Sequence, residues 1–231
     1  MFTAALLEQP AHRPWGLTAA YLATVVSVAD PEKLGRVQVR LLALDGVEDQ
    51  DAPVWARVAV PFAGSDRGAF LIPDVGDEVL VNFVNADPRL PVVVGGLWSG
   101  TAKPPEQLSG DRIDRWTFTG KAGTRIAIVE ENQQPVIELE TPGGVSATLQ
   151  DAGGGKLELV AAGCTITLES SGITIQTGST VTVKGSTLDV TAASVNVNAA
   201  SSTFSGMVKC DVLQATTVIA STYTPGAGNI W

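Results

Sequence analysis

An apolar-x-apolar triplet recurs five times between Thr165 and Val197, at intervals of seven or eight residues. Each triplet is long enough for one very short strand with two side chains on the same face. The small polar residues between the triplets suit tight corners. The pattern therefore predicts a stack of short strands whose apolar positions are Ile166/Leu168, Ile173/Ile175, Val181/Val183, Leu188/Val190 and Val195/Val197.

The way in which these strands close a core follows from their number. A single-chain solenoid with three faces would need three triplets per coil and about three coils to be stable, and the regular tract supplies fewer than two coils. If three identical chains wind around one axis, each triplet becomes one face of a rung. We therefore predict an intertwined homotrimeric β-helix, with the aliphatic side chains on the axis and strand edges paired with the next chain rather than exposed.

A different alternation occupies the first half of the chain. Turn signals such as Asp30-Pro31 and Asp87-Pro88 separate five strand candidates, which are Tyr21–Val28, Arg36–Leu42, Val54–Val60, Glu78–Phe83 and Pro91–Gly95. Five strands in about 80 residues predict a small closed barrel of the OB type. Gly35 and Gly76 suit turns with positive φ, and Asp77 beside the second turn is interpreted as solvated or capping.

Composition supports an all-β chain, because 24 Gly and 13 Pro accompany many Thr, Val and Ser and no long helix-period run is found. The predicted organisation has five parts. They are an N-terminal tail at residues 1–16, an OB-fold barrel at 17–100, a linker and neck at 101–143, the trimeric β-helix at 144–220 and an apex segment at 221–231.

Charge and hydropathy exclude several classes of protein. The net charge of −9, with no Lys/Arg cluster, argues against nucleic acid as a partner, because phosphate binding depends on basic side chains. No segment approaches the roughly 20 apolar residues of a membrane helix. Residues 1–7 lack a basic region and an adequate apolar region, so we expect synthesis in the cytoplasm without a Sec signal.

Four runs of the barrel carry a family resemblance: Lys33–Arg40, Val54–Gly64, Gly68–Val79 and Asp87–Leu97. In order and spacing they resemble the OB domain of the baseplate central spike family, which includes phage tail spikes of the baseplate assembly protein V type and the VgrG proteins of type VI secretion. It also includes the spikes of related extracellular contractile injection systems. The stretch 115–128 is similar to the neck between barrel and needle in that family.

The resemblance implies a function and a set of partners. The chain is expected to be a structural central spike in a phage tail or an extracellular injection particle. It would form a homotrimer, dock onto a threefold hub protein at the end of the tube and pierce the target cell envelope, with transient contact to the membrane. A PAAR-like tip protein would cap the apex, where Tyr223, Ile230 and Trp231 are the candidate docking residues. A frayed terminus is the alternative for this segment.

Candidate chemistry is sparse. The single histidine, His12, lies in the N-terminal tail without a Ser or Cys motif around it, and about fifteen residues between Trp98 and the neck leave no room for a lysozyme domain. We therefore expect no enzymatic site, metal or cofactor. Cys164 and Cys210 share faces with aliphatic residues, so both are interpreted as small apolar core residues.

Two other functions stay open at the level of sequence. An OB-type ligand-binding module could use Trp55, Phe62, Phe70 and Phe83 as a stacking surface, although residues 17–100 contain six basic and eleven acidic side chains. A trimeric receptor-binding fibre would also use a β-helix. The barrel resemblance favours neither of them.

Overall fold

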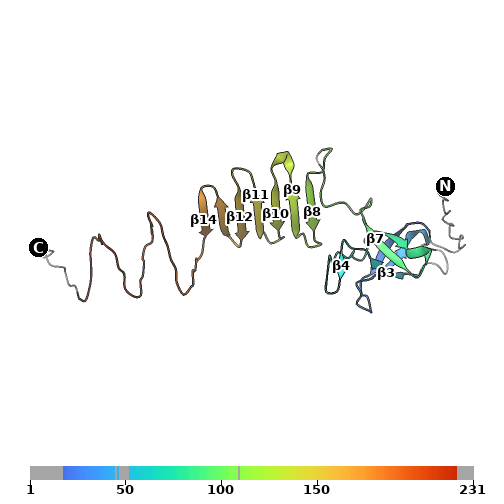
Figure 1. Cartoon of the computed structure of the whole chain (residues 1–231), viewed down its shortest axis with the longest axis horizontal. Helices are drawn as coiled ribbons and strands as arrows, with labels where there is room; N and C mark the ends of the chain where they lie inside the picture. Colours follow the sequence, from blue (N-terminus) through green and yellow to red (C-terminus); the bar gives the residue numbers. More distant parts are fainter. Residues whose placement is uncertain (1–17, 45, 47–51, 109, 223–231) are drawn as a thin grey trace, which may run out of the picture. The chain divides into compact units, whose positions relative to one another are not determined.

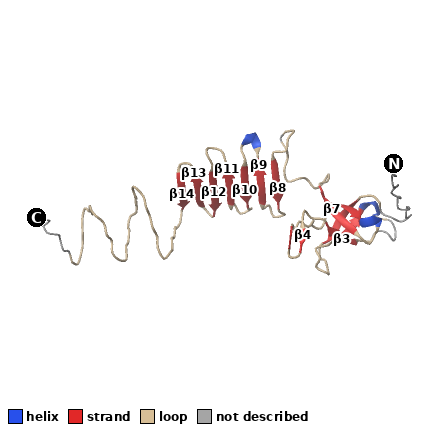
Figure 2. Cartoon of the chain, in the orientation of Figure 1, coloured by secondary structure: helices blue, strands red, loops and turns tan. Residues whose placement is uncertain are grey.

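The computed structural model describes residues 18–44, 46, 52–108 and 110–222. Every element in this part of the chain is a β-strand or a single turn of 3-10 helix (Figure 2). The predicted all-β fold class is therefore confirmed. The chain divides after Thr180 into two units, and the first contains all the strands.

Five strands form a closed barrel, and all five were predicted. They are β1 (Tyr21–Ser27), β2 (Val37–Leu41), β3 (Val54–Val58), β6 (Glu78–Phe83) and β7 (Pro91–Leu97). Their order around the barrel is β1-β2-β3-β7-β6, with β6 returning to β1. Neighbours are antiparallel except β3 and β7, which pair in parallel.

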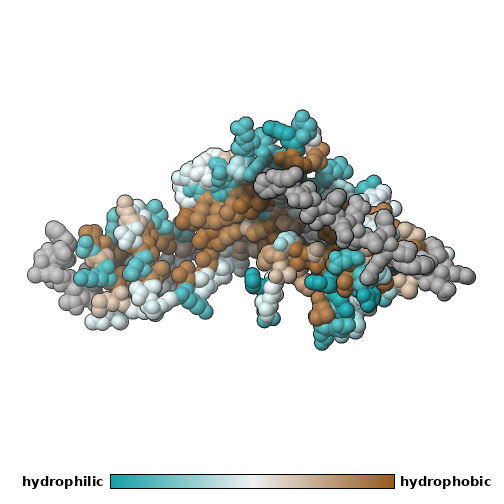
Figure 3. All heavy atoms as spheres, turned by 45° about the vertical axis from the view of Figure 1, so that its right-hand side comes forward, coloured by the Kyte–Doolittle hydropathy of each residue, from teal (hydrophilic) through white to brown (hydrophobic). Residues whose placement is uncertain are grey.

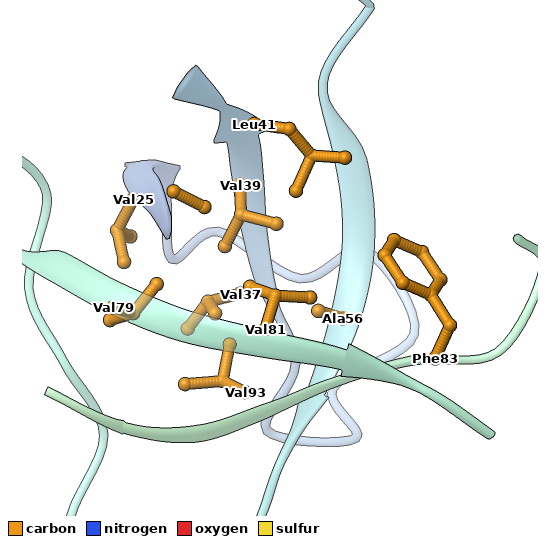
Figure 4. Packing of buried hydrophobic residues seen from close by; sticks show 10 residues of the cluster. Val25, Val37, Val39, Leu41, Ala56, Val79, Val81, Phe83 and Val93 are labelled. Atoms are coloured by element: carbon orange, nitrogen blue, oxygen red, sulfur yellow. The ribbon is translucent and has the colours of Figure 1, made fainter. Parts of the chain in front are cut away.

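The barrel interior is filled by β-branched side chains from alternate strand positions (Figure 4). The largest fully buried side chains are all valines: Val25, Val37, Val39, Val79, Val81 and Val93. Valine suits this place because its stiff, branched side chain packs well on a pleated surface. At one end of the core, the rings of Tyr21 and Phe83 meet edge to face with centroids 5.7 Å apart.

Two carboxylates hold the turns of the barrel. Asp30 accepts backbone N–H bonds from Leu34 at 2.8 Å and from Glu32 at 3.1 Å in the connection from β1 to β2. Asp77 accepts the N–H of Asp74 at 2.8 Å, so of the two predicted roles, solvated or capping, the structure shows capping. Gly76 in the same turn has a φ of 94°, a conformation that only glycine adopts without strain.

The connection between β3 and β6 contains a short hairpin that was not predicted. Its strands are β4 (Ala63–Gly64) and β5 (Arg67–Gly68). Two 3-10 turns, η1 (Leu42–Leu44) and η2 (Val84–Ala86), follow β2 and β6. The η2 turn and the residues after it connect β6 to β7 at the rim of the barrel.

Seven further strands form one antiparallel meander, in which each strand pairs with the next along the chain (Figure 1). They are β8 (Arg115–Thr119), β9 (Arg125–Val129), β10 (Val136–Glu140), β11 (Ser146–Gln150), β12 (Lys156–Ala161), β13 (Cys164–Glu169) and β14 (Gly172–Thr177). The turn η3 (Glu131–Gln133) joins β9 to β10. The expected boundary between residues 143 and 144 falls in the turn between β10 and β11.

Residues 178–222 contain no assigned strand, and their side chains are exposed. Of the five predicted short strands, the first two lie in β13 and β14, and the other three fall in this segment. A strand is assigned only where backbone groups pair with a neighbour, and these residues have no such neighbour within the one chain. In the single chain, the backbone groups of residues 178–222 are therefore not engaged in strand pairing.

Candidate functional site: an apolar face on the seven-stranded sheet

The meander places two continuous rows of apolar side chains on one face of the sheet. The first row, defined by successive cross-strand pairs, is Trp116, Ile128, Ile137, Leu149, Leu157, Leu168 and Ile173. The second row is Phe118, Ile126, Leu139, Ala147, Leu159, Ile166 and Ile175. We call these fourteen residues the apolar face. With strands about 4.8 Å apart, it is roughly 30 Å long.

Most of the apolar face is open to solvent in the single chain. The aromatic side chains at its first strand, Trp116 and Phe118, are 49% and 65% exposed, and Ile173 on its last strand is 72% exposed. Apolar atoms gather over the sheet in Figure 3. An unbroken apolar surface of this length is characteristic of a protein–protein interface, since monomeric soluble proteins rarely expose one.

One part of the apolar face is hollowed. Ala147 is the smallest of the fourteen side chains, and beside it lies a cavity of about 490 Å³. Its lining includes Ile126, Leu139, Leu159 and Cys164. Most residues of this lining are apolar, so the cavity suits an aliphatic or aromatic side chain.

The opposite face of the sheet is polar and carries an ion-pair network. Glu106, from the linker, accepts hydrogen bonds from Thr117 Oγ1 at 2.9 Å, from Arg125 Nη2 at 3.0 Å and from Arg115 Nη1 at 3.3 Å. Arg125 also pairs with Glu138 on β10. These contacts fasten the linker to the strands β8 to β10.

The same contacts set the ionisation of Glu106. The hydrogen bond from Thr117, followed by that from Arg125, lowers the pKa of the Glu106 carboxyl below its ordinary value. In turn, its carboxylate neighbours raise the pKa of Arg125, with the bond to Glu138 as the largest cause. The Glu106 carboxylate and the Arg125 guanidinium therefore both stay charged throughout the neutral range.

The structure brings together only part of the predicted core. Ile166, Leu168, Ile173 and Ile175 lie on the apolar face, where Ile166 pairs with Ile175 and Leu168 with Ile173. The remaining predicted core residues lie in the segment without strands and are each more than half exposed: Val181, Val183, Leu188, Val190, Val195 and Val197. The predicted apex residues Tyr223, Ile230 and Trp231 lie outside the described residues.

The two cysteines are both free and exposed in the single chain. The sulfur of Cys164 donates to Thr177 Oγ1 at 3.1 Å across the β13–β14 pair. Their predicted burial is therefore not achieved within one chain, because the face on which Cys164 lies is uncovered.

Sequence reasoning missed ten of the fourteen residues of the apolar face, namely those on β8 to β12. The signal was present, because each of these strands carries the same apolar-x-apolar triplet. Successive triplets there are nine to eleven residues apart rather than seven or eight. The longer interval, which reflects longer strands and turns, concealed the repeat.

Within residues 18–44, 52–108 and 110–222, no three His, Cys, Asp or Glu side chains are placed to hold a metal ion. In the same part of the chain, no helix has the length and apolar character needed to cross a bilayer.

Family comparisons match both halves of the chain. Residues 21–98 match the type VI secretion system/phage-baseplate injector OB domain, and this range contains the whole closed barrel. Residues 136–203 match the phage baseplate V C-terminal trimerisation domain. That second match begins at β10 and continues past β14 into the segment without strands, so it joins the apolar face to the later triplets.

Relatives are found among secretion system spikes. The type VI secretion system spike protein VgrG2a of Pseudomonas aeruginosa is 36% identical over 97 residues, which are 40% of this chain and 12% of that protein. The spike protein VgrG3 of Vibrio cholerae is 33% identical over 112 residues, 43% of this chain and 11% of that protein. The actin cross-linking toxin VgrG1 of Vibrio cholerae is 38% identical over 60 residues, 26% of this chain and 6% of that protein.

The chain thus spans no more than 12% of the length of any of these three relatives. The two family matches together cover more than half of this chain, in the order that the resemblance of the sequence implied. The chain belongs to the central spike family of phage baseplates and type VI secretion systems, with an injector OB domain followed by a trimerisation domain.

Proposed function

We propose that this chain forms a homotrimeric central spike of a contractile injection machine and that its role is mechanical. The observation that carries the proposal is the apolar face, which runs across all seven strands with no charged residue in either row. A face of this kind requires a partner surface of the same length and character. Two further copies of the same chain supply it.

Three copies fit this face better than two. Three flat sheets, each turning its apolar face inward, enclose a triangular prism whose interior is closed on every side, and a cyclic arrangement is the simplest symmetric way to do so. The match of residues 136–203 to a trimerisation domain supports the same number. Each level of the prism would contain two inward side chains from each chain.

The interior of such a prism would narrow along the chain. The two rows begin with Trp116 and Phe118, continue mainly with Ile and Leu, and are followed in the sequence by triplets ending at Val195 and Val197. Because smaller side chains allow the chains to approach more closely, the spike would be tapered toward its C-terminal part.

The segment 178–222 would form the shaft by winding of three chains about one axis. Its triplets keep the inward pattern of the apolar face, yet no strand pairing is assigned within the chain. Buried backbone groups must be paired, so in the assembled shaft each N–H and C=O would bond to a neighbouring chain. Val181, Val183, Leu188, Val190, Val195 and Val197 would then line the axis, as the sequence predicts.

The remaining parts of the chain would connect the spike to the machine and to its target. The barrel would attach to a threefold hub at the end of the tube, and the C-terminal residues would meet a PAAR-like tip protein. Contraction would drive the spike through the target envelope, so resistance to bending and unravelling is the property that matters. Interchain hydrogen bonds and a dry aliphatic interior provide that resistance.

A complementation experiment tests the proposed function. Particles from cells producing the wild-type chain should carry it at the tip, as located by immunogold electron microscopy, and should release a dye from vesicles made of target-envelope lipids. Leu149→Asp places three carboxylates inside the prism and should abolish tip labelling and dye release, whereas Thr148→Asp on the polar face should preserve both. Dye release by the Leu149→Asp particles at the wild-type level would refute the proposal.

A further inference from the structure

A hollow on the outer surface of the barrel has no role in the trimer described above. It lies between the connection from β1 to β2, the strand β3 and the connection from β6 to β7, and its volume is about 550 Å³. Three arginines, Arg36, Arg57 and Arg89, line it together with Trp55. In OB folds, the face formed by the second and third strands and these two connections is a common place for ligands.

The strand β3 positions two of these side chains. Ala56 is fully buried in the barrel core, so its neighbours Trp55 and Arg57 point away from the core, on the outer side of the same strand. The Arg36 guanidinium carbon lies 5.7 Å from the centre of the Trp55 ring. One side of the indole is thus covered by a cation that belongs to the protein.

The three arginines differ in their partners. Arg36 is engaged by Asp30 at 2.7 Å and by Glu32 at 2.9 Å. Arg89 forms a bidentate pair with Asp87, through Nε at 3.0 Å and Nη2 at 2.7 Å, but its side chain is 85% exposed, so solvent screens the pair. Among the residues that the structure describes, Arg57 has no ion pair and no side-chain hydrogen bond.

The rim of the hollow is apolar. Leu34 is 67% exposed, and Val84 and Leu90 are 47% and 48% exposed, which is unusual for aliphatic side chains so close together on a small barrel. Pro91 and Val92 of β7 complete the apolar lining. The hollow therefore combines an aliphatic rim with one uncommitted guanidinium, that of Arg57, and a second whose ion pair is exposed to solvent.

We propose that this hollow binds an extended segment of a protein partner in which a carboxylate stands beside an aliphatic side chain. The carboxylate would pair with Arg57 and draw in Arg89, and the aliphatic side chain would pack on Leu34, Leu90 and the indole of Trp55. Charge complementarity of this kind fixes the register of a docked segment and excludes uncharged ones.

The same features disfavour the other ligands of OB folds. Oligonucleotides need a run of uncommitted cations and open aromatic faces. Here Asp30 and Glu32 engage Arg36, Asp87 engages Arg89, and Arg36 covers one side of Trp55, so only the Arg57 guanidinium is uncommitted. The rim offers aliphatic groups rather than the convergent polar groups that sugars require.

The inference rests on the proposed function in one respect, because the partner would be a component of the machine on which the spike is mounted. The hollow itself is contained within the barrel. Binding to it is therefore measurable whatever the number of chains, and light scattering on the same samples reports separately on the trimer.

The test uses the full chain and two fluorescein-labelled peptides, Gly-Ser-Leu-Glu-Leu-Glu-Ser-Gly and the same sequence with Gln in place of Glu. Anisotropy titration should show saturable binding of the Glu peptide at least about tenfold tighter than that of the Gln peptide, as expected for one charge-assisted pair. Arg57→Ala should weaken the Glu peptide about tenfold. Arg67→Ala removes an arginine of the same barrel outside this hollow and should leave binding unchanged.

Four results would overturn the inference, three of them in the peptide titrations. One is equal affinity for the Glu and Gln peptides, a second is no saturable binding up to about 1 mM, and a third is equal loss in the Arg57→Ala and Arg67→Ala variants. Displacement of the Glu peptide by a twelve-residue oligothymidylate at lower concentration than by unlabelled peptide would also contradict it, because it would identify the hollow as a nucleic-acid site.

Discussion

At the scale of single residues, a few charged side chains hold together parts of the chain that have little apolar core. Asp30 is the clearest case, because its carboxylate is 4% exposed and accepts three backbone N–H bonds besides the Arg36 guanidinium. These hydrogen bonds, and not buried apolar side chains, fix the conformation of the connection from β1 to β2. The hydrogen bond from Arg36 is the largest cause of the lowered pKa of Asp30.

Asp30→Asn should therefore destabilise the barrel and change its response to acid. A carboxyl whose pKa is depressed in the folded state stabilises that state above the unfolded pKa of about 4, and this contribution is lost as the pH falls through the lower folded pKa. We expect the melting temperature of the variant to be lower by roughly 5 °C at pH 7. Below pH 4 the wild-type melting temperature should fall more steeply than that of the variant.

Thermal melting of the full chain between pH 2 and pH 7, followed by circular dichroism, measures both effects. Asp66→Asn is the matched control, since within the described residues the Asp66 carboxylate accepts a single long hydrogen bond, from Ser65 at 3.4 Å. Parallel pH profiles for wild type and Asp30→Asn would contradict this account of the turn.

Glu106 performs a similar task for the linker, which it fastens to β8 and β9. Glu106→Ala removes the acceptor of Thr117, Arg115 and Arg125 and should release residues 101–114 from the sheet. Trypsin should then cleave after Arg112 several-fold faster than in wild type, because cleavage of a native protein follows local opening. Gln107→Ala, an exposed neighbour, should cleave at the wild-type rate, and equal rates in all three proteins would refute the fastening role.

At the scale of elements, the sequence predicts the positions of most single strands, but it predicts only part of their pairing. The five barrel strands were located within a few residues because Val-rich alternation and Pro or Gly turns coincide there. The meander has a weaker signal, since the sequence pattern predicts that β13 and β14 are faces of separate rungs. Their register, with Leu168 opposite Ile173, instead makes them a hairpin of one chain.

The apolar face had a readable signal only where its triplets are seven or eight residues apart. From β8 to β13 successive triplets are nine to eleven residues apart, so they fall outside the short repeat although each strand keeps its apolar-x-apolar pattern. The ion pairs of Glu106 had no sequence signal, because the partners are up to 19 residues apart and meet only through the meander. The same is true of the hollow beside Trp55, which three separate segments of the barrel line.

A pair of substitutions in β11 tests the assignment of the two sheet faces. Leu149 lies on the apolar face and Thr148 on the polar one, at adjacent positions of the same strand. Leu149→Asp should dissociate the trimer, because three unpaired carboxylates would be buried together. Thr148→Asp should leave the mass of the assembly unchanged, and sedimentation velocity distinguishes the two outcomes.

Dissociation by Thr148→Asp, or an intact assembly in Leu149→Asp, would contradict the assignment of the faces. Circular dichroism of both variants reports whether the barrel remains folded. This control separates dissociation from unfolding, because the β-sheet signal of a folded barrel persists whatever the number of chains.

At the scale of the whole molecule, two modes of association are expected in one assembly. The sheet from β8 to β14 satisfies its internal backbone pairing within each chain, so its copies would associate through side chains alone. Residues 178–222 have no strand pairing of their own and would depend on bonds between chains. The second mode requires three chains to separate together, which predicts high kinetic stability.

Shortening the chain after Thr180 should separate these modes. The full chain should migrate as a high-mass band on an unheated SDS gel, whereas the shortened chain should remain associated in native buffer and run as a single chain in SDS. The expected difference in unfolding half-life is at least about a hundredfold, since loss of the interwound shaft removes most of the kinetic barrier. Equal SDS resistance of the two proteins would show that the shaft is not interwound.

The mass of the full chain in solution tests the central claim most directly. Size-exclusion chromatography with multi-angle light scattering should give three times the chain mass of 23.9 kDa, close to 72 kDa, at every concentration in the micromolar range. A mass of about 24 kDa at micromolar concentration would contradict the account, because the apolar face would then be stable in water without a partner.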